Sequence, residues 1–168
     1  MLFRSDADVA LRASNTPPDV LVGRRISTIA GAVYGPRSLA DKPGLTPLTY
    51  DGPWVGFGDP IQNTTGAKWV KANIPPEQIV VKVNGMIGLV EAVAAGLGVA
   101  LLPCFTGEMR PDLVRIGDPI PEAASSLWLL THPDLRRSAR VRVFMDFFGA
   151  EISKMKHQLG CVGAIPSR

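Results

Sequence analysis

The sequence predicts an α/β fold, and three features of its 168 residues support this prediction. In some segments of the chain apolar residues recur at every second position, as in strands, and in other segments they recur about every 3.6 residues, as in helices. The segment IVVKV at 79–83 is strongly β-branched, which favours a buried strand. The stretch EAVAAGLGVALLP at 91–103 ends a helix, turns through two glycines and continues as an aliphatic strand. A strand, a helix and a second strand in succession predict a parallel βαβ unit over 79–103.

The first half of the chain supplies short strands separated by loops that are rich in turn-forming residues. The segment SNTPPD bounds the first strand, and Pro36 closes the third. Thr64 or Thr65 suits the N-cap of a helix that the pair Pro75–Pro76 stops. The elements expected before residue 79 are strands at 7–12, 24–29, 30–35 and 54–57, a short helix near 38–41, a loop over 43–53 and a helix over 67–72.

The βαβ unit contains the signals that start and stop its helix. Asn84 is a good N-cap residue, and Gly96 stands where a helix end needs a left-handed residue. The run 99–102 is too apolar to alternate, so we expect a strand covered on both faces. Pro103 removes a backbone donor where that strand would leave its sheet. The apolar residues that recur at helical spacing are Met86, Val90, Val93 and Leu97.

The last third predicts two strands, a helix and a tail. The strands are LVRI at 113–116 and LWLLTH at 127–132, and the helix starts near Ser138. Its outer side offers an ion pair between Arg142 and Asp146, which stand four residues apart. From Lys156 onward we expect a frayed tail. The expected apolar face of the helix consists of Val141, Phe144 with Met145, Phe148, Ile152 and Met155.

Composition narrows the class of protein. Hydrophobic residues make up 46% and charged residues 20%, which is ordinary for a globular chain and excludes a disordered one. The net charge of +3 is too small to predict a nucleic acid or a membrane as partner. Cys104 and Cys161 do not make a disulfide framework, and as free thiols they suit a reducing cytoplasm. Because the sequence has no signal-peptide core and no apolar run of membrane-span length, we expect a cytoplasmic protein.

No motif in the sequence predicts catalysis, a metal site or a cofactor. GLGVAL lacks the third glycine of the dinucleotide fingerprint, and its glycines follow a helix instead of opening one. P-loop, HExxH and GxSxG motifs are absent. His132 and His157 have no cysteine or carboxylate at metal-ligand spacing, so we interpret His132 as a histidine at a strand end or in a loop. Cys104 is interpreted as a small buried hydrophobic residue.

Four segments, taken in order, resemble the effector-binding domain of LysR-type bacterial transcriptional regulators. The resemblance runs from about Ala7 to Ile152, and AAGLGVALLP and LWLLTHPDLRRSARVR are its most specific parts. The four segments are ADVALR, VYGPRSLA, VNGMIGLVEAVAAGLGVALLP and LWLLTHPDLRRSARVRVFMDFF. The resemblance implies a type II periplasmic-binding-protein-like fold, in which two Rossmann-like subdomains are joined by two crossing segments and a small ligand lies between them.

The same resemblance implies a division of the chain. Residues 1–154 would form a partial LysR substrate-binding domain, and residues 155–168 a C-terminal tail. Because family members begin with a helix-turn-helix domain and the first elements of subdomain I, we expect this chain to be N-terminally truncated. Subdomain I would be incomplete and the DNA-binding domain absent. The expected parts are subdomain I at 1–31 and 106–154, subdomain II at 37–100, and crossings at 32–36 and 101–105.

Effector-binding residues are expected beyond the carboxyl ends of the strands, where crevices of such folds lie. The helix start at Asn84 and Gly85 offers free backbone donors and the positive end of the helix dipole. Each candidate also has a purely structural interpretation. Asn84 could act only as a cap, Asp59 only as a turn former, and Arg12 only as a partner of Asp19 or another surface acid. The remaining candidates are Phe57, Gly58 and Asp59 after one strand, Leu102 and Pro103 at the second crossing, and Arg12 at the end of ADVALR.

The function predicted from this resemblance is that of an effector-sensing module. A small organic anion would bind between the subdomains and change their closure or their oligomer contacts. Family members commonly assemble side by side and antiparallel, so we expect a homodimer or a higher homo-oligomer. DNA would be contacted only through a domain outside this chain. Two alternatives stay open: a solute-binding protein of a transport system, and a remnant without function.

Overall fold

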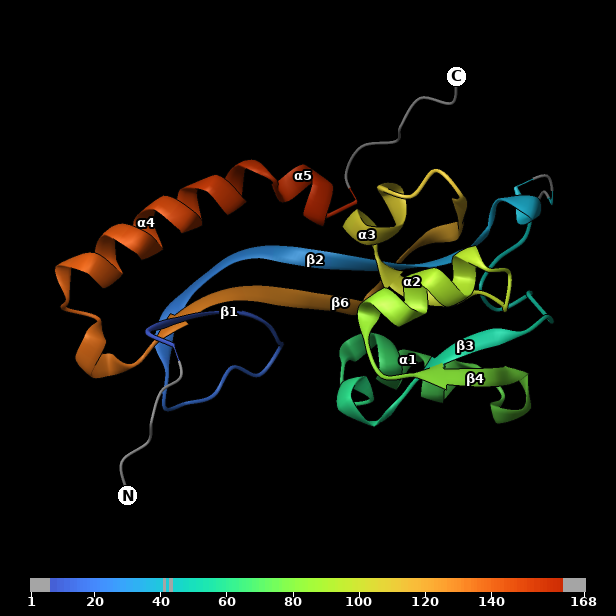
Figure 1. Cartoon of the computed structure of the whole chain (residues 1–168), viewed down its shortest axis with the longest axis horizontal. Helices are drawn as coiled ribbons and strands as arrows, with labels where there is room; N and C mark the ends of the chain where they lie inside the picture. The colour runs from blue at the N-terminus through green and yellow to red at the C-terminus, as the bar shows by residue number, and fades with distance from the viewer. Residues whose placement is uncertain (1–6, 41, 43, 162–168) are drawn as a thin grey trace.

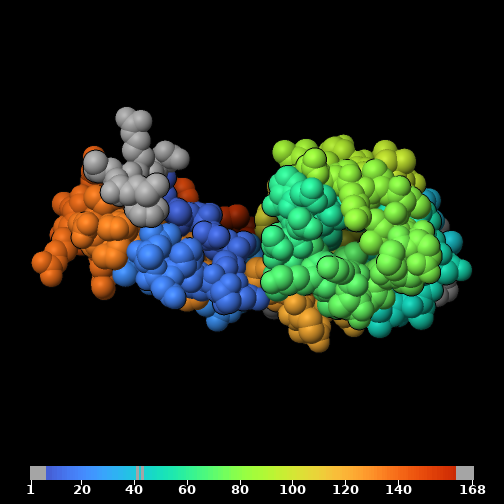
Figure 2. Space-filling model, turned by 90° about the horizontal axis from the view of Figure 1, so that it is seen from below, coloured from blue at the N-terminus to red at the C-terminus, as the bar shows by residue number. Residues whose placement is uncertain are grey.

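The computed structural model describes residues 7–40, 42 and 44–161, and its chain forms two lobes (Figure 1). The first lobe holds β1 (Val9–Ala13), the start of β2 (Val22–Pro36), the end of β6 (Leu113–Thr131) and α4 (Ala139–Lys154). Figure 2 shows the lobes as two rounded masses joined at a narrower waist. The second lobe contains β3 (Trp54–Phe57), α1 (Thr65–Asn73), β4 (Ile79–Val83), α2 (Met86–Ala94), β5 (Ala100–Pro103) and α3 (Cys104–Glu108).

Two long antiparallel strands, β2 and β6, run from one lobe to the other. They pair from Val22 opposite Thr131 to Pro36 opposite Leu113, in a four-stranded sheet of order β1-β6-β2-β5. The prediction of two short strands within each segment is therefore wrong. Ile29 pairs with Ser125 and Gly31 pairs with Ile120, so residues 121–124 have no partner in β2 and form a bulge. β6 continues on both sides of this bulge. A loop-like sequence is compatible with a long strand when a neighbouring strand continues on both sides of the irregularity.

The second lobe is built around parallel strands, as predicted. β3 pairs with β4 in parallel, and Trp54 of β3 bridges to Val99, the residue just before β5. The predicted βαβ unit over 79–103 is confirmed, with β3 lying between its two strands. The prediction of a buried strand at 79–83 is wrong, because β4 pairs on one side only among the described residues. Its side chains alternate in burial, and Val80 is 59% exposed.

The ends of the second-lobe helices follow local signals, with one exception. Thr64 caps α1 by accepting a hydrogen bond from the Ala67 N–H at 3.3 Å. Gly96 has a φ of +78° and closes α2, while the Leu97 N–H donates to the Ala92 carbonyl at 3.0 Å. Asn84 is not the cap as predicted, because α2 starts one residue later and Gly85 takes the N-cap position.

The remaining described elements are short connections. The helix expected near 38–41 is the single turn η1 (Arg37–Leu39), and Asp41 lies outside the described residues. His132 directly follows β6, as predicted for a strand-end residue. The other connections are η2 (Asp59–Ile61), η3 (Pro76–Gln78), η4 (Pro133–Leu135) and the C-terminal turn α5 (Lys156–Leu159).

The main hydrophobic core lies in the second lobe, and the first lobe has a much smaller one. α4 covers the sheet of the first lobe with few side chains: Val141 is buried, but the predicted apolar face is otherwise largely open. The predicted pair of Arg142 and Asp146 is also wrong. Asp146 lies 3.5 Å from the Arg24 guanidinium, because β2 brings that arginine beneath the helix. The exposed apolar side chains of α4 and its end are Val143, Phe144, Phe147, Phe148 and Met155.

The C-terminal segment 156–161 packs against the rest of the described chain, contrary to the expectation of a frayed tail. After α4 the chain forms α5, whose Leu159 is buried in the small core of the first lobe. Cys161 then forms a disulfide with Cys104, and their Cα atoms are 5.6 Å apart. The prediction of two free thiols is wrong, because the fold brings together residues that are 57 positions apart. The rest of the predicted tail, 162–168, lies outside the described residues.

Candidate functional site

Four of the predicted residues come together at the carboxyl ends of β3 and β4, and we call Phe57, Gly58, Asn84 and Gly85 the strand-end site. The Gly58 N–H donates to the Val83 carbonyl at 2.8 Å, which fixes the two strand ends side by side. The Asn84 side-chain oxygen lies so close to Gly58 that a Cβ atom at this position would displace it. Asp59 follows at the start of η2 with an exposed side chain.

The start of α2 leaves backbone donors open within the strand-end site. No side chain of the described residues caps this helix, and Gly85 is in an extended conformation with a φ of −161°. The first intrahelical bond is donated by Leu89 to the Gly85 carbonyl, so the N–H groups of the first turn have no helical acceptor. A Cβ atom on Gly85 would meet nothing within 4 Å. This open, positively polarised helix start is suited to an anionic group.

The start of α1 touches the strand that connects the lobes. The Thr65 hydroxyl shares a short hydrogen bond with the Ser125 hydroxyl of β6. Sequence reasoning identified Thr65 only as an alternative cap and did not select Ser125. The signal that could have found Ser125 is the polar pair Ser125–Ser126 just before the apolar run of LWLLTH. The bond links the start of α1 in the second lobe to the connecting strand β6.

The other predicted residues lie apart from the strand-end site. Leu102 is fully buried and pairs with Ala32, while Pro103 is partly exposed and pairs with Gly31. Arg12 is exposed on β1 in the first lobe, opposite Trp128 of β6. Among the described residues its guanidinium has no ion pair, so the expected pairing with Asp19 is not formed.

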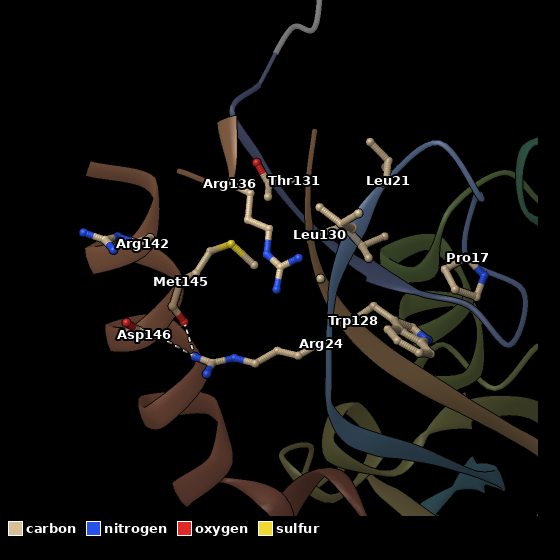
Figure 3. Close-up of a pocket in the computed structure, with 12 residues that line it drawn as sticks. Pro17, Leu21, Arg24, Trp128, Leu130, Thr131, Arg136, Arg142, Met145 and Asp146 are labelled. Atoms are coloured by element: carbon tan, nitrogen blue, oxygen red, sulfur yellow. Dashed lines mark hydrogen bonds and ion pairs between the residues drawn. The ribbon is translucent and has the colours of Figure 1, made fainter. Parts of the chain in front are cut away.

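A second candidate is a cavity of about 570 Å³ between α4 and the sheet of the first lobe. Figure 3 shows the Arg136 side chain entering this cavity and Arg142 pointing away from it. Arg24 spans its lower side and donates to the Met145 carbonyl at 2.5 Å. Arg24 lies close to Asp146, and Arg142 points away from the cavity. Arg136 is therefore the arginine of this cavity that is best placed to bind a ligand. A larger cavity of about 730 Å³ lies along α1 and the stretch 118–122 of β6.

Within 7–40, 42 and 44–161, no group of three or more histidine, cysteine and acidic side chains could hold a metal ion. None of the described helices is long and apolar enough to cross a membrane.

Comparison with known proteins identifies the family. The model of the family described as LysR substrate binding domain matches residues 1–153. This chain belongs to the LysR substrate-binding domain family. The LysR domain is the effector-binding part of LysR-type transcriptional regulators, a regulatory class and not an enzyme class. The match therefore favours a regulator over a solute-binding protein of a transport system.

Solved structures of LysR regulatory domains share the periplasmic-binding-protein-like fold of this chain. The CrgA regulatory domain of Neisseria meningitidis gives a TM-score of 0.67 at 20% identity, covering 86% of this chain and 74% of that one. The CcmR regulatory domain of Synechocystis, in complex with 2-PG, gives 0.66 at 16% identity, covering 89% and 76%. The regulatory domain of AphB from Vibrio vulnificus gives 0.60 at 19% identity, covering 89% and 78%. No curated protein sequence matches this chain.

Proposed function

We propose that this LysR domain senses a small organic anion, which binds at the strand-end site between the two lobes. The observation that carries the proposal is the uncapped start of α2 beside the end of β3. A carboxylate at this position would accept bonds from backbone N–H groups that have no other acceptor in the helix. Asn84 would add a side-chain donor from the same turn. The anionic character of the effector follows from this excess of donors.

The position of the site gives such a ligand a means of signalling. Figure 1 shows the ends of β3 and β4 directed toward the first lobe. An anion held there would attract cations of the first lobe, and Arg12 on β1 is exposed without an ion pair among the described residues. A ligand that binds the closed arrangement of the lobes more tightly would shift the population toward it. The hydrogen bond of Thr65 to Ser125 is a contact that such a movement would change.

The wider cellular role is part of the same proposal. The intact bacterial regulator would act in the cytoplasm and contact DNA through a helix-turn-helix domain. The division into subdomain I at 1–31 and 106–154, subdomain II at 37–100 and crossings at 32–36 and 101–105 stays a prediction. The strand pairing shows that β6 continues from the second lobe to the first after α3, next to β2 over most of its length.

Replacing Gly85 by aspartate is expected to weaken anion binding by about tenfold or more, because the new carboxylate would cap α2 and repel the ligand. The fold should tolerate the change, since the position is open and extended. Calorimetry with acetate, succinate, benzoate and citrate would compare the affinities of the two proteins.

Gly85→Ser is the matched control, because a serine caps the same helix without a charge. We expect it to reduce affinity less than Gly85→Asp does. Arg136→Gln tests whether the anion binds in the arginine-lined cavity of the first lobe instead of at the strand-end site. A large loss of affinity in Arg136→Gln, with none in Gly85→Asp, would move the site to the first lobe and reject the proposal.

We further propose that the domain forms a homodimer through the open face of α4. The Phe144 and Phe148 rings stack with centroids 4.7 Å apart, and Phe147 meets Phe148 edge to face. A cluster of exposed aromatic rings favours association, because burial removes apolar area from water. Phe147 is 62% exposed, so its replacement leaves the core of the domain intact.

Phe147→Glu is expected to convert the dimer to a monomer, with no change in the midpoint of thermal unfolding of the monomer. Light scattering coupled to size exclusion would measure the mass of both proteins. Ile87→Glu is the control, because Ile87 is an exposed apolar residue of α2 in the second lobe. Dissociation by Ile87→Glu alone would place the interface on the second lobe instead.

A further inference from the structure

The disulfide between Cys104 and Cys161 is a covalent connection that the effector site does not explain. Cys104 opens α3 at the edge of the second-lobe core and is fully buried. Cys161 follows α5, whose Leu159 packs against Ile26, Leu127 and Leu129 in the small core of the first lobe. The disulfide therefore fastens the C-terminal end of the first lobe to the second lobe. It adds a covalent connection to those that β2 and β6 provide.

The two sulfur atoms differ in their surroundings. The Arg115 guanidinium donates to the Cys161 sulfur at 3.1 Å, and Cys161 is partly exposed. A neighbouring cation stabilises a thiolate, so a reduced Cys161 would be the more reactive thiol. Cys104 has no solvent exposure and lies among apolar side chains, which disfavours its thiolate.

Polar side chains hold Arg115 in place beside the disulfide. Glu108 lies 3.0 Å from the Arg115 guanidinium and also accepts a hydrogen bond from the Tyr34 hydroxyl at 3.0 Å. Burial, together with the Glu108 charge, raises the pKa of Tyr34 above its usual range, so this hydroxyl remains a donor. The Glu108 oxygen is 4.0 Å from the Cys161 sulfur and opposes part of the effect of Arg115.

We propose that Cys104 and Cys161 form a thiol–disulfide exchange site, which reacts with glutathione-type thiols and disulfides and fastens or releases the two lobes. The motivation is chemical. Disulfides in reducing compartments are commonly transient or redox-sensing. In this bond Cys161 is partly exposed and its sulfur lies beside the Arg115 guanidinium. The proposal uses none of the residues of the strand-end site. It therefore stands or fails independently of the anion.

In the oxidising direction, the Cys161 thiolate attacks glutathione disulfide. A bond forms between the Cys161 sulfur and one glutathione sulfur, and the other glutathione leaves as a thiolate. Cys104 then attacks the Cys161 sulfur and passes its proton to the departing glutathione sulfur, which leaves as the second glutathione thiol. Two electrons pass from the cysteine pair to glutathione disulfide, and two glutathione thiols result. In the reducing direction, a thiolate attacks Cys161, because Cys104 is inaccessible.

The asymmetry between the sulfurs gives the sharpest test. Cys104→Ser leaves the Cys161 thiol, and Cys161→Ser leaves the Cys104 thiol. With Ellman's reagent at neutral pH, we expect Cys104→Ser to react at least about tenfold faster than Cys161→Ser. Adding Arg115→Gln to Cys104→Ser should slow the reaction severalfold and raise the pH at which the rate reaches half its plateau. Equal rates for the two single variants would overturn the assignment of Cys161 as the attacked sulfur.

The wild-type chain tests the exchange itself without any substitution. It would be equilibrated with mixtures of reduced and oxidised glutathione, alkylated and digested without reduction. We expect a peptide pair joining Cys104 to Cys161 that appears and disappears reversibly as the ratio changes. Hydrogen exchange should be faster at 156–161 in the reduced protein, because the lobes are then no longer fastened at that end. Absence of the joined peptides at every ratio, or exchange at 156–161 that does not respond to reduction, would reject the proposal.

Discussion

Replacing Trp54 by alanine is expected to lower the free energy of unfolding by about 3–5 kcal/mol. Trp54 is completely buried at the start of β3, where it bridges to Val99 and joins β3 to β5. Its ring also meets the Tyr50 ring edge to face, with centroids 6.4 Å apart. Truncation would remove the largest side chain of the second-lobe core and leave a cavity that rigid strands cannot close. Since domains of this size are stable by about 5–15 kcal/mol, this is a large part of the total.

Trp54→Phe distinguishes the contribution of the aromatic ring to stability from that of the indole N–H. The indole N–H of Trp54 is buried and has no hydrogen-bond partner among the described residues. Phenylalanine removes this unpaired donor and keeps an aromatic ring, so we expect it to destabilise by less than half as much as alanine does. Urea unfolding monitored by circular dichroism would measure both variants. A phenylalanine variant as unstable as the alanine variant would contradict the absence of a partner for the indole.

Replacing Gly98 by alanine is expected to lower the free energy of unfolding by about 3 kcal/mol, by combining backbone strain with a collision. Gly98 has a φ of +155°, a conformation that residues with a side chain rarely adopt. A Cβ atom there would strike the Pro53 carbonyl, which accepts a hydrogen bond from the Val99 N–H at 2.9 Å. The collision would disturb the junction where β5 joins β3. Loss of this junction should also disturb the strand-end site, which lies at the other end of β3.

Gly96→Ala is the matched control for this prediction. Gly96 also has a positive φ, of +78°, but a Cβ atom there would meet nothing within 4 Å. We expect a loss of about 1 kcal/mol, which is the cost of the left-handed conformation alone. Thermal and urea unfolding of the two variants would therefore measure the collision as a difference. An equal loss of unfolding free energy in the two variants would show that the Pro53 carbonyl moves aside for the new side chain without a measurable cost.

The second lobe was largely predictable from the sequence, because the signals that define it are local. WVGF and IVVKV became β3 and β4 with the predicted bounds, and the two glycines after α2 end one element and begin the next. Asn84 was wrongly placed as the cap, since a preference for one residue type does not fix a helix start to a single position. The convergence of Phe57, Gly58, Asn84 and Gly85 followed from the parallel order of the strands, which place their carboxyl ends at one edge. Whether an anion binds there remains a prediction.

The first lobe was less predictable, because its organisation depends on contacts between distant residues. Strands were predicted to end at residues 29 and 116, yet β2 and β6 continue past both positions as partners of each other. The apolar stripe of α4 predicted a buried face, and the helix instead leaves most of that stripe exposed. Hydrophobic periodicity shows that a helix is amphipathic, but it does not show how much of the apolar face is covered by another element.

By itself, the sequence determined the α/β class, the parallel unit at 79–103 and the resemblance to LysR effector-binding domains, because caps, glycine turns and β-branched runs act over a few residues. Only the tertiary structure decided the pairing of Arg24 with Asp146 and the disulfide of Cys104 with Cys161. The Arg24 contact at Met145 joins residues that are 121 positions apart. No local preference encodes such a contact, since it forms only after the long strands have fixed which surfaces face each other.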